Sequence, residues 1–168
     1  MTRRHRAGAR PRQPAGRRPG YLPWLAAAAV AAAFILMVAA LARQPRLPRV
    51  GDHWHARFTL EVCGTVQPPF PPSPGDVHTH GDGVIHIHPS TRETSGRAAS
   101  LGAFFRSTGM RLTPSTLSLP DGRTLRDGER CPDGRQARLR VLVNGREIRD
   151  PRAYVPQDRD QVRVIYGP

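Results

Sequence analysis

The sequence predicts an α+β fold in which a single helix packs on a small mixed or antiparallel sheet, preceded by one transmembrane helix. Three observations lead to this prediction. An uncharged apolar segment occupies residues 22–42, residues 53–63 alternate between apolar and polar side chains, and one helical pattern at residues 100–109 separates two groups of short β-type segments. Strands, a single helix and further strands in one domain are typical of the α+β class.

The apolar segment at residues 22–42 is long enough to cross a membrane, because a helix of this length spans roughly 30 Å. Tyr21 and Trp24 lie where interfacial aromatic residues are expected. Seven arginines precede the segment and three follow it within Arg43–Arg49, which predicts a cytoplasmic N-terminus and an extracytoplasmic C-terminal domain. The alternative is a signal peptide cleaved after the Ala-Leu-Ala sequence at residues 40–42, and export of the domain follows from either interpretation.

These features divide the chain into four parts. Residues 1–21 are an Arg-rich cytoplasmic tail, residues 22–42 the anchor, residues 43–50 a stalk rich in Pro and Arg, and residues 51–168 a His-rich extracytoplasmic domain large enough for one core. The net charge of +13 reflects 26 basic residues, all arginine, against 13 acidic residues that all follow residue 50. The arginines of the domain are scattered and rarely interleaved with aromatics, so the charge does not indicate a nucleic-acid site.

The two cysteines, Cys63 and Cys131, are predicted to form a disulfide, because exported thiols are usually oxidised. The bridge would close a loop of about 69 residues and constrain the unfolded chain by roughly 4 kcal/mol. In the alternative interpretation one or both thiolates are metal ligands.

The first strand of the domain is expected at residues 53–63, with Trp54 and Phe58 on an apolar face and His53 and His55 on a polar face. Residues 66–75 contain five prolines and are therefore expected to form a surface loop. Two short strands should follow, at residues 77–80 and 84–88, around the Gly-Asp-Gly turn cluster at residues 81–83.

A single helix is expected next, with Ser100 as its N-cap, apolar side chains at helical spacing from Leu101, and Gly109 ending it. Short strands should come after it. They are placed at residues 116–119, 137–143, 146–148 and 161–166, with the Asn-Gly pair at residues 144–145 forming a hairpin turn. A β-grasp arrangement is the specific fold that we expect from this order.

Six of the seven histidines lie within 36 residues as three His-x-His pairs, whereas His5 lies in the tail and is excluded. Side chains that are two residues apart on a strand point to the same face of the sheet. Each pair therefore presents two imidazoles together. The pairs are His53 and His55, His78 and His80, and His86 and His88.

The length of the turn between the second and third pairs decides whether they converge. A two-residue loop would place His78 and His80 on the core side with the isoleucines. A three-residue loop at residues 81–83 pairs His78 with His86 and keeps all four histidines on the polar face. We favour the second, because burying imidazoles among apolar side chains without partners is costly. His78 and His86 are then expected at the heart of the site, and the first strand adds its own pair if it lies alongside.

Clustered imidazoles suit Zn or Cu, whereas Ca²⁺ and Mg²⁺ prefer oxygen ligands. Nearby carboxylates are candidates for a further ligand or for partners that orient the imidazoles. They are Asp52, Asp76, Asp82 and Glu61.

Four strings of the sequence resemble a family of uncharacterised, mainly actinobacterial exported or membrane-anchored proteins. They are His-Trp-His-Ala from residue 53, His-Thr-His-Gly-Asp-Gly-Val-Ile-His-Ile-His-Pro at residues 78–89, Leu-Gly-x-Phe-Phe from residue 101, and Val-Asn-Gly from residue 143. The resemblance covers roughly residues 51–168 and implies the same localisation. More distant members often carry an acidic residue at the position of His88.

The leading hypothesis is therefore a binding module of the cell envelope that captures Zn or Cu on a histidine face. A zinc-dependent hydrolase-type enzyme, with Glu61 or Asp82 as base, is the first alternative. A non-metal adaptor whose histidines sense pH is the second. The sequence names no protein partner.

Overall fold

The computed structural model describes residue 20, residues 22–42 and residues 45–168. Predictions that concern the N-terminal tail, including His5 and Tyr21, lie outside the described residues. The chain divides into two compact units, one ending at Gln44 and one beginning at Pro45.

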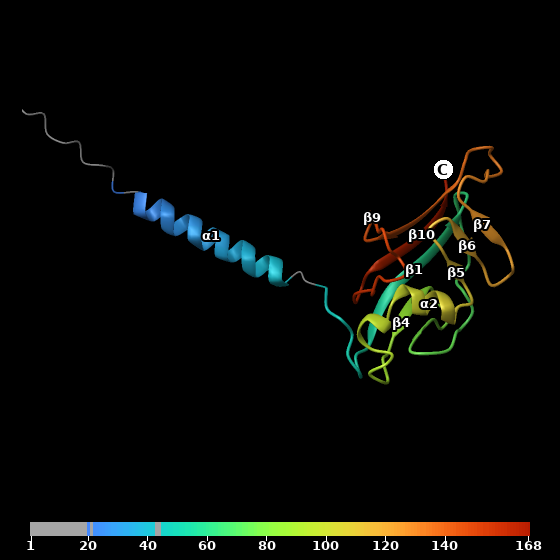
Figure 1. Cartoon of the computed structure of the whole chain (residues 1–168), viewed down its shortest axis with the longest axis horizontal. Helices are drawn as coiled ribbons and strands as arrows, with labels where there is room; N and C mark the ends of the chain where they lie inside the picture. The colour runs from blue at the N-terminus through green and yellow to red at the C-terminus, as the bar shows by residue number, and fades with distance from the viewer. Residues whose placement is uncertain (1–19, 21, 43–44) are drawn as a thin grey trace, which may run out of the picture. The chain divides into compact units, whose positions relative to one another are not determined.

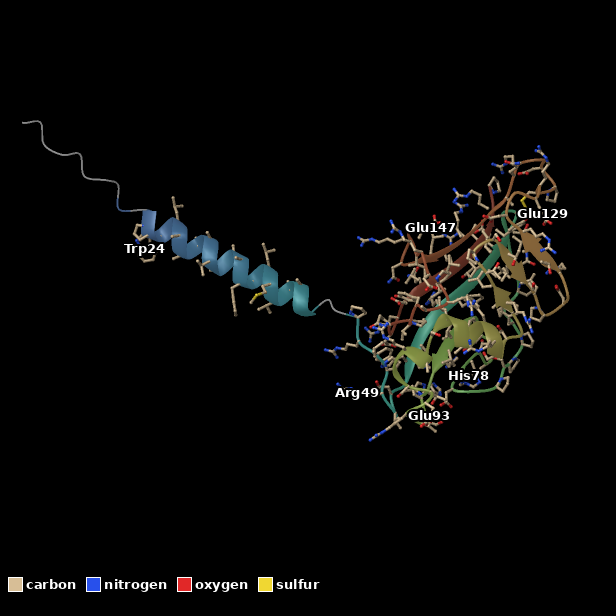
Figure 2. The ribbon with its side chains drawn as sticks, in the orientation of Figure 1. Trp24, Arg49, His78, Glu93, Glu129 and Glu147 are labelled. Atoms are coloured by element: carbon tan, nitrogen blue, oxygen red, sulfur yellow. A yellow bond between two sulfur atoms is a disulfide. The ribbon has the colours of Figure 1, made fainter. Side chains whose placement is uncertain are left out.

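The first unit contains one helix, α1 (Leu22–Ala42), with the bounds expected from the sequence. Figure 2 shows apolar side chains projecting from it on several sides, among them Trp24, which is 77% exposed. The helix is long and apolar enough to cross a membrane by length and composition, a criterion that a signal sequence near the N-terminus also meets. A helix that is hydrophobic all round requires an apolar environment, which agrees with a membrane-anchored or exported protein.

The second unit is an α+β domain built on one mixed sheet in the order β3-β4-β1-β10-β8-β9, with the short β2 also paired to β1 (Figure 1). The first and last long strands, β1 and β10, run parallel at its centre, and the other neighbours are antiparallel. The strands are β1 (Trp54–Val62), β2 (Thr65–Val66), β3 (Val77–His78), β4 (Val84–Ile87), β8 (Arg138–Val143), β9 (Arg146–Glu147) and β10 (Gln161–Gly167).

Helix α2 (Leu101–Ser107) lies in the connection between the two halves of this sheet. An antiparallel pair (β1 and β4), a helix and a second antiparallel pair (β8 and β10), with β1 and β10 parallel in the middle, have the strand order expected for a β-grasp arrangement. Ser100 occupies the N-cap position without a side-chain hydrogen bond, and Gly109 (φ 76°) follows the C-cap in the left-handed conformation. Gly102 has no room for a side chain, since a Cβ there would lie 2.8 Å from the carbonyl oxygen of Arg152.

The core lies between α2 and the apolar face of the sheet. The alternation expected for β1 is confirmed, because Ala56, Phe58 and Leu60 are buried, and the Phe58 and Phe104 rings meet with centroids 5.0 Å apart. Ile85 and Ile87 of β4 are fully buried beside them. Because strand side chains alternate, the neighbours of these core residues are held on the opposite face of the sheet.

A second, three-stranded sheet was only partly expected from the sequence. It consists of β5 (Arg111–Leu112), β6 (Thr116–Ser118) and β7 (Thr124–Arg126), of which only β6 was predicted. The other two are too short to show a period-2 pattern. The remaining helical element is the 3-10 helix η1 (Gly96–Ala98).

The Asn-Gly turn between β8 and β9 has the predicted conformation, since Asn144 (φ 51°) and Gly145 (φ 79°) both have positive φ. Strand β3 is shorter than expected. It ends at His78 because the Thr79 backbone N–H turns to the Ser73 hydroxyl and the Thr79 hydroxyl accepts from the Gly81 N–H.

Cys63 and Cys131 form a disulfide, with Cα atoms 5.6 Å apart. The bridge ties the segment after β1 to the segment after β7. The alternative in which a thiolate binds a metal ion does not hold, because both cysteines are oxidised.

Candidate metal centre

Three adjacent strands carry the histidines in one row. His55 of β1 lies opposite His86 of β4, and His86 lies opposite His78 of β3. The register confirms the predicted cross-strand pair of His78 and His86, and the first strand does lie alongside. His88 follows β4 and His80 follows β3, each two residues from its partner, so these side chains share the face opposite Ile85 and Ile87.

The closest group of possible ligands consists of His53, His55, His86 and His88, whose ligand nitrogens all lie within 4.8 Å of one another. The Nε2 atoms of His53 and His55 are 3.0 Å apart, and the His53 and His88 ring centroids are 3.7 Å apart. The Nε2 atom of His88 is buried and has no hydrogen-bond partner among the described residues. Burying a nitrogen without a partner costs free energy, and a cation bound by this nitrogen would remove that cost.

His78 and His80 form a second pair beside this group. Their Nε2 atoms are 3.2 Å apart. The His80 ring lies 4.4 Å from the His86 ring between centroids, and the His78 ring stacks on His86 at 5.6 Å. The structure therefore brings all six predicted histidines together, but it centres the closest group on His86 with the β1 pair rather than on His78.

Of the four predicted carboxylates, only Asp82 contacts an imidazole, with its Oδ2 2.9 Å from Nε2 of His86. Asp52 accepts from the Arg49 N–H, and Asp76 accepts from the N–H and hydroxyl of Ser90. Glu61 forms an ion pair with Arg163 on the neighbouring strand, at 2.9 Å.

One carboxylate near the histidines was missed by the sequence analysis. Asp158 accepts a hydrogen bond from the backbone N–H of His55, 103 residues away in the chain. It lies in the connection to β10, which pairs with β1, and no local pattern in the sequence indicates this contact.

The electrostatics of the face lower the pKa values of three imidazoles and of one carboxylate. Burial and the nearby His53, together with other imidazoles, lower the pKa of His88 to about 4. Burial and neighbouring imidazoles also lower the pKa values of His78 and His55. Although burial alone would raise it, hydrogen bonds from His86 and the Val84 N–H hold the pKa of Asp82 at about 2. Neutral imidazole is the form that ligates a metal ion.

The arrangement has the chemistry of a transition-metal site. Two nitrogens bound at 2.0–2.1 Å to one tetrahedral Zn²⁺ lie about 3.3 Å apart, close to the 3.0 Å between His53 and His55. The Asp82 carboxylate on His86 corresponds to the partner that usually orients a metal-bound imidazole. This cluster could therefore hold a metal ion.

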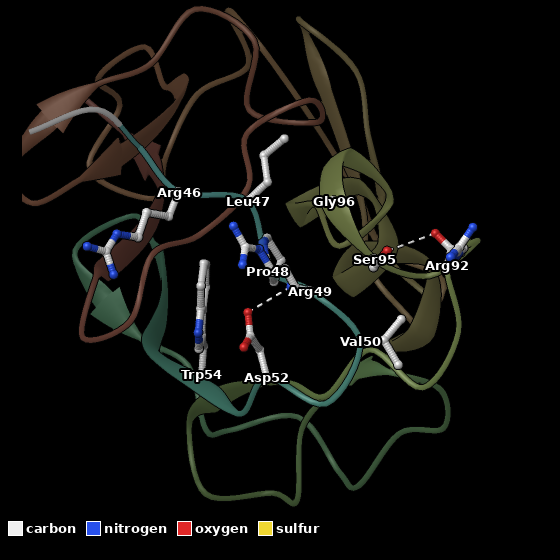
Figure 3. A pocket seen from close by; sticks show the side chains of 10 residues that line it. All are labelled: Arg46, Leu47, Pro48, Arg49, Val50, Asp52, Trp54, Arg92, Ser95 and Gly96. Carbon is white, nitrogen blue, oxygen red and sulfur yellow. Dashed lines mark hydrogen bonds between the residues drawn. The ribbon is translucent and has the colours of Figure 1, made fainter. Parts of the chain in front are cut away.

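A cavity of about 950 Å³ is a separate feature of the domain (Figure 3). Trp54, Asp52 and the arginines Arg46, Arg49 and Arg92 are among its lining residues, and none of those residues is a histidine. Trp54 belongs to the apolar face of β1, whereas the neighbouring histidines lie on the other face. The cavity is therefore not the metal centre.

Comparisons with protein-family models, curated proteins and solved structures find no match for this chain. The resemblance to an actinobacterial exported family remains a prediction. The assignment of a metal centre rests on the geometry of the histidines.

Proposed function

We propose that this protein is a membrane-anchored extracytoplasmic module that captures Zn or Cu on the histidine face of its domain. One observation carries the proposal. Four imidazole nitrogens, from His53, His55, His86 and His88, lie within 4.8 Å of one another on adjacent strands. All-nitrogen donors of this kind favour Zn and Cu over the oxygen-seeking Ca²⁺ and Mg²⁺.

The carboxylates favour a binding module over the hydrolase alternative. A general base works best when its pKa lies near the working pH. The pKa of Asp82 is held at about 2, and Glu61, near the far end of β1, is engaged by Arg163 of β10. Asp82 is therefore suited to orienting His86, and the carboxylate of Glu61 is already paired with a cation.

The location of the module outside the cytoplasm is supported by two features. The disulfide between Cys63 and Cys131 suits an oxidising compartment. The excess of arginines before α1 over those directly after it favours a cytoplasmic N-terminus.

Metal binding by the full-length protein tests the proposal. The chain is purified in detergent with an affinity tag that contains no histidine, and Zn(II) and Cu(II) binding at pH 7.5 is measured by calorimetry and elemental analysis. His86→Ala/His88→Ala removes both histidines of the β4 segment and should weaken binding at least about 100-fold, because even outer partners of a metal ligand contribute 10- to 100-fold.

His5→Ala is the matched control, since it removes a histidine outside the domain and should leave affinity unchanged. Wild-type protein that takes up neither ion would refute the proposal and favour the adaptor alternative. Wild-type affinity in the His86→Ala/His88→Ala variant would refute the site.

A further inference from the structure

The histidine face offers more ligands than one ion requires. A four-coordinate Zn²⁺ site uses at most four protein ligands, whereas six imidazoles form this continuous cluster. The closest group of possible ligands does not include His78 and His80. These two residues lie on the side of His86 that is away from β1.

Four of the six side chains form two chelating pairs, one on either side of β4. His53 and His55 of the β1 edge have Nε2 atoms 3.0 Å apart, and His78 and His80 of the β3 edge have Nε2 atoms 3.2 Å apart. Both separations are close to the roughly 3.3 Å between two nitrogens on one tetrahedral Zn²⁺. No ring contact within the ranges described joins the first pair to the second.

The β4 histidines lie between these pairs and can complete both. The His88 ring is next to His53, with centroids 3.7 Å apart. The His86 ring is 4.4 Å from His80 and 4.8 Å from His55. We propose that the face binds two transition-metal ions side by side, the first on His53, His55 and His88, and the second on His78, His80 and His86.

Asp82 supports the second site by orienting His86. Its carboxylate lies 2.9 Å from Nε2 of His86, and when it accepts a hydrogen bond from the N–H at that position the Nδ1 lone pair is free for a metal ion. Three histidines at each site leave a fourth position open for water or an exogenous ligand.

This inference rests on the proposed metal-binding function. The number of bound ions distinguishes a failure of the two-ion inference from a failure of the proposed function. Full-length protein without a His-tag is titrated with Zn(II), and its stoichiometry is read by native mass spectrometry and by elemental analysis after removal of free ion. Two ions per chain support the inference. One ion overturns it and leaves the proposed function standing, whereas no ion overturns both.

Matched variants then assign the ions. His78→Ala/His80→Ala should retain one ion, and His53→Ala/His55→Ala should also retain one. If the first double variant does not fold, as judged by circular dichroism, the single change of the exposed His80 to Asn replaces it and should weaken only the second binding step. Two ions of unchanged affinity in a folded variant of the His78 and His80 pair would overturn the assignment.

A spectroscopic readout distinguishes adjacent ions from a second ion bound elsewhere. Cu(II) at two equivalents should give an electron paramagnetic resonance spectrum broadened by dipolar coupling between neighbouring ions. The His78→Ala/His80→Ala variant should give the spectrum of an isolated ion. An uncoupled spectrum from wild-type protein at two equivalents would overturn the side-by-side arrangement.

Discussion

Individual imidazoles on the histidine face differ in how strongly the fold opposes their protonation. His88 is partly buried and faces other imidazoles, so its pKa falls to about 4. His78 and His55 have their pKa values lowered for the same reasons, burial first and the charges of neighbouring histidines second. The domain thereby keeps these residues in the neutral form that can bind a cation. In the absence of a bound cation, the same effect should make the domain less stable in acid.

The metal-free protein should lose stability as the pH falls below about 6.5, the ordinary pKa of histidine. In this window the unfolded chain binds protons that folded His88, His78 and His55 do not, so protons favour unfolding. For His88 the loss accumulates down to its folded pKa of about 4. Melting temperatures measured in chelator between pH 7.5 and pH 4.5 should decline steadily.

The matched variant His88→Asn should show a shallower decline, because it removes an imidazole whose pKa is lowered to about 4 in the folded protein. A melting temperature that is constant or rises across this window would contradict the prediction. Asp82 does not obscure the result, since its contribution is lost mainly below its unfolded pKa of about 3.9, which lies under this window.

At the scale of elements, the turn between β3 and β4 aligns the histidines. Gly81 (φ 89°) and Gly83 (φ 74°) adopt left-handed conformations that other residues rarely take. Asp82 between them accepts from the Val84 N–H and contacts His86, so the same residue shapes the turn and orients the ligand. The odd length of the turn places His78 opposite His86 rather than opposite a core residue.

The disulfide between Cys63 and Cys131 links two elements that the chain separates by 68 residues. Cys63→Ser/Cys131→Ser should lower the free energy of unfolding by about 4 kcal/mol, because a loop of this length is no longer closed in the unfolded chain. The melting temperature should fall by roughly 15 °C.

Thermal unfolding in chelator, followed by circular dichroism, measures this effect without interference from bound metal. Reduced wild-type protein is the control and should melt with the double-serine variant. Equal melting temperatures for the oxidised wild type and the variant would show that the bridge does not stabilise the domain.

At the scale of the whole molecule, the chain consists of an apolar helix and an α+β domain, described as separate units. The helix and the disulfide fit a membrane-anchored or exported protein, while the orientation across the membrane is part of the proposal. The proposal requires the histidine face to meet metal ions outside the cytoplasm.

A reporter enzyme that is active only outside the cytoplasm tests this orientation. Fused after Pro168, it should be active, and fused before Met1 it should be inactive. The mature protein should retain Trp24, because the anchor is not cleaved. An N-terminal sequence that begins at Arg43 would instead establish a secreted protein without an anchor.

Local patterns were sufficient for much of the fold and for the composition of the site. The length of the apolar segment determined α1, strict alternation determined the two faces of β1, and the spacing of three His-x-His pairs identified the ligands. The parity of the turn at residues 81–83 correctly predicted that His78 and His86 pair. These features depend on residues close in the sequence, where periodicity and turn length are decisive.

Only the tertiary structure decided how the strands of the domain combine and which side chains meet. The parallel pairing of β1 with β10 brings Asp158 to His55 and engages Glu61 with Arg163, contacts that span more than 100 residues. The placement of one histidine pair on each side of β4 likewise depends on strand order. The sequence by itself determined which residues lie on the histidine face, because alternation is local, whereas their partners follow from long-range pairing that no local pattern encodes.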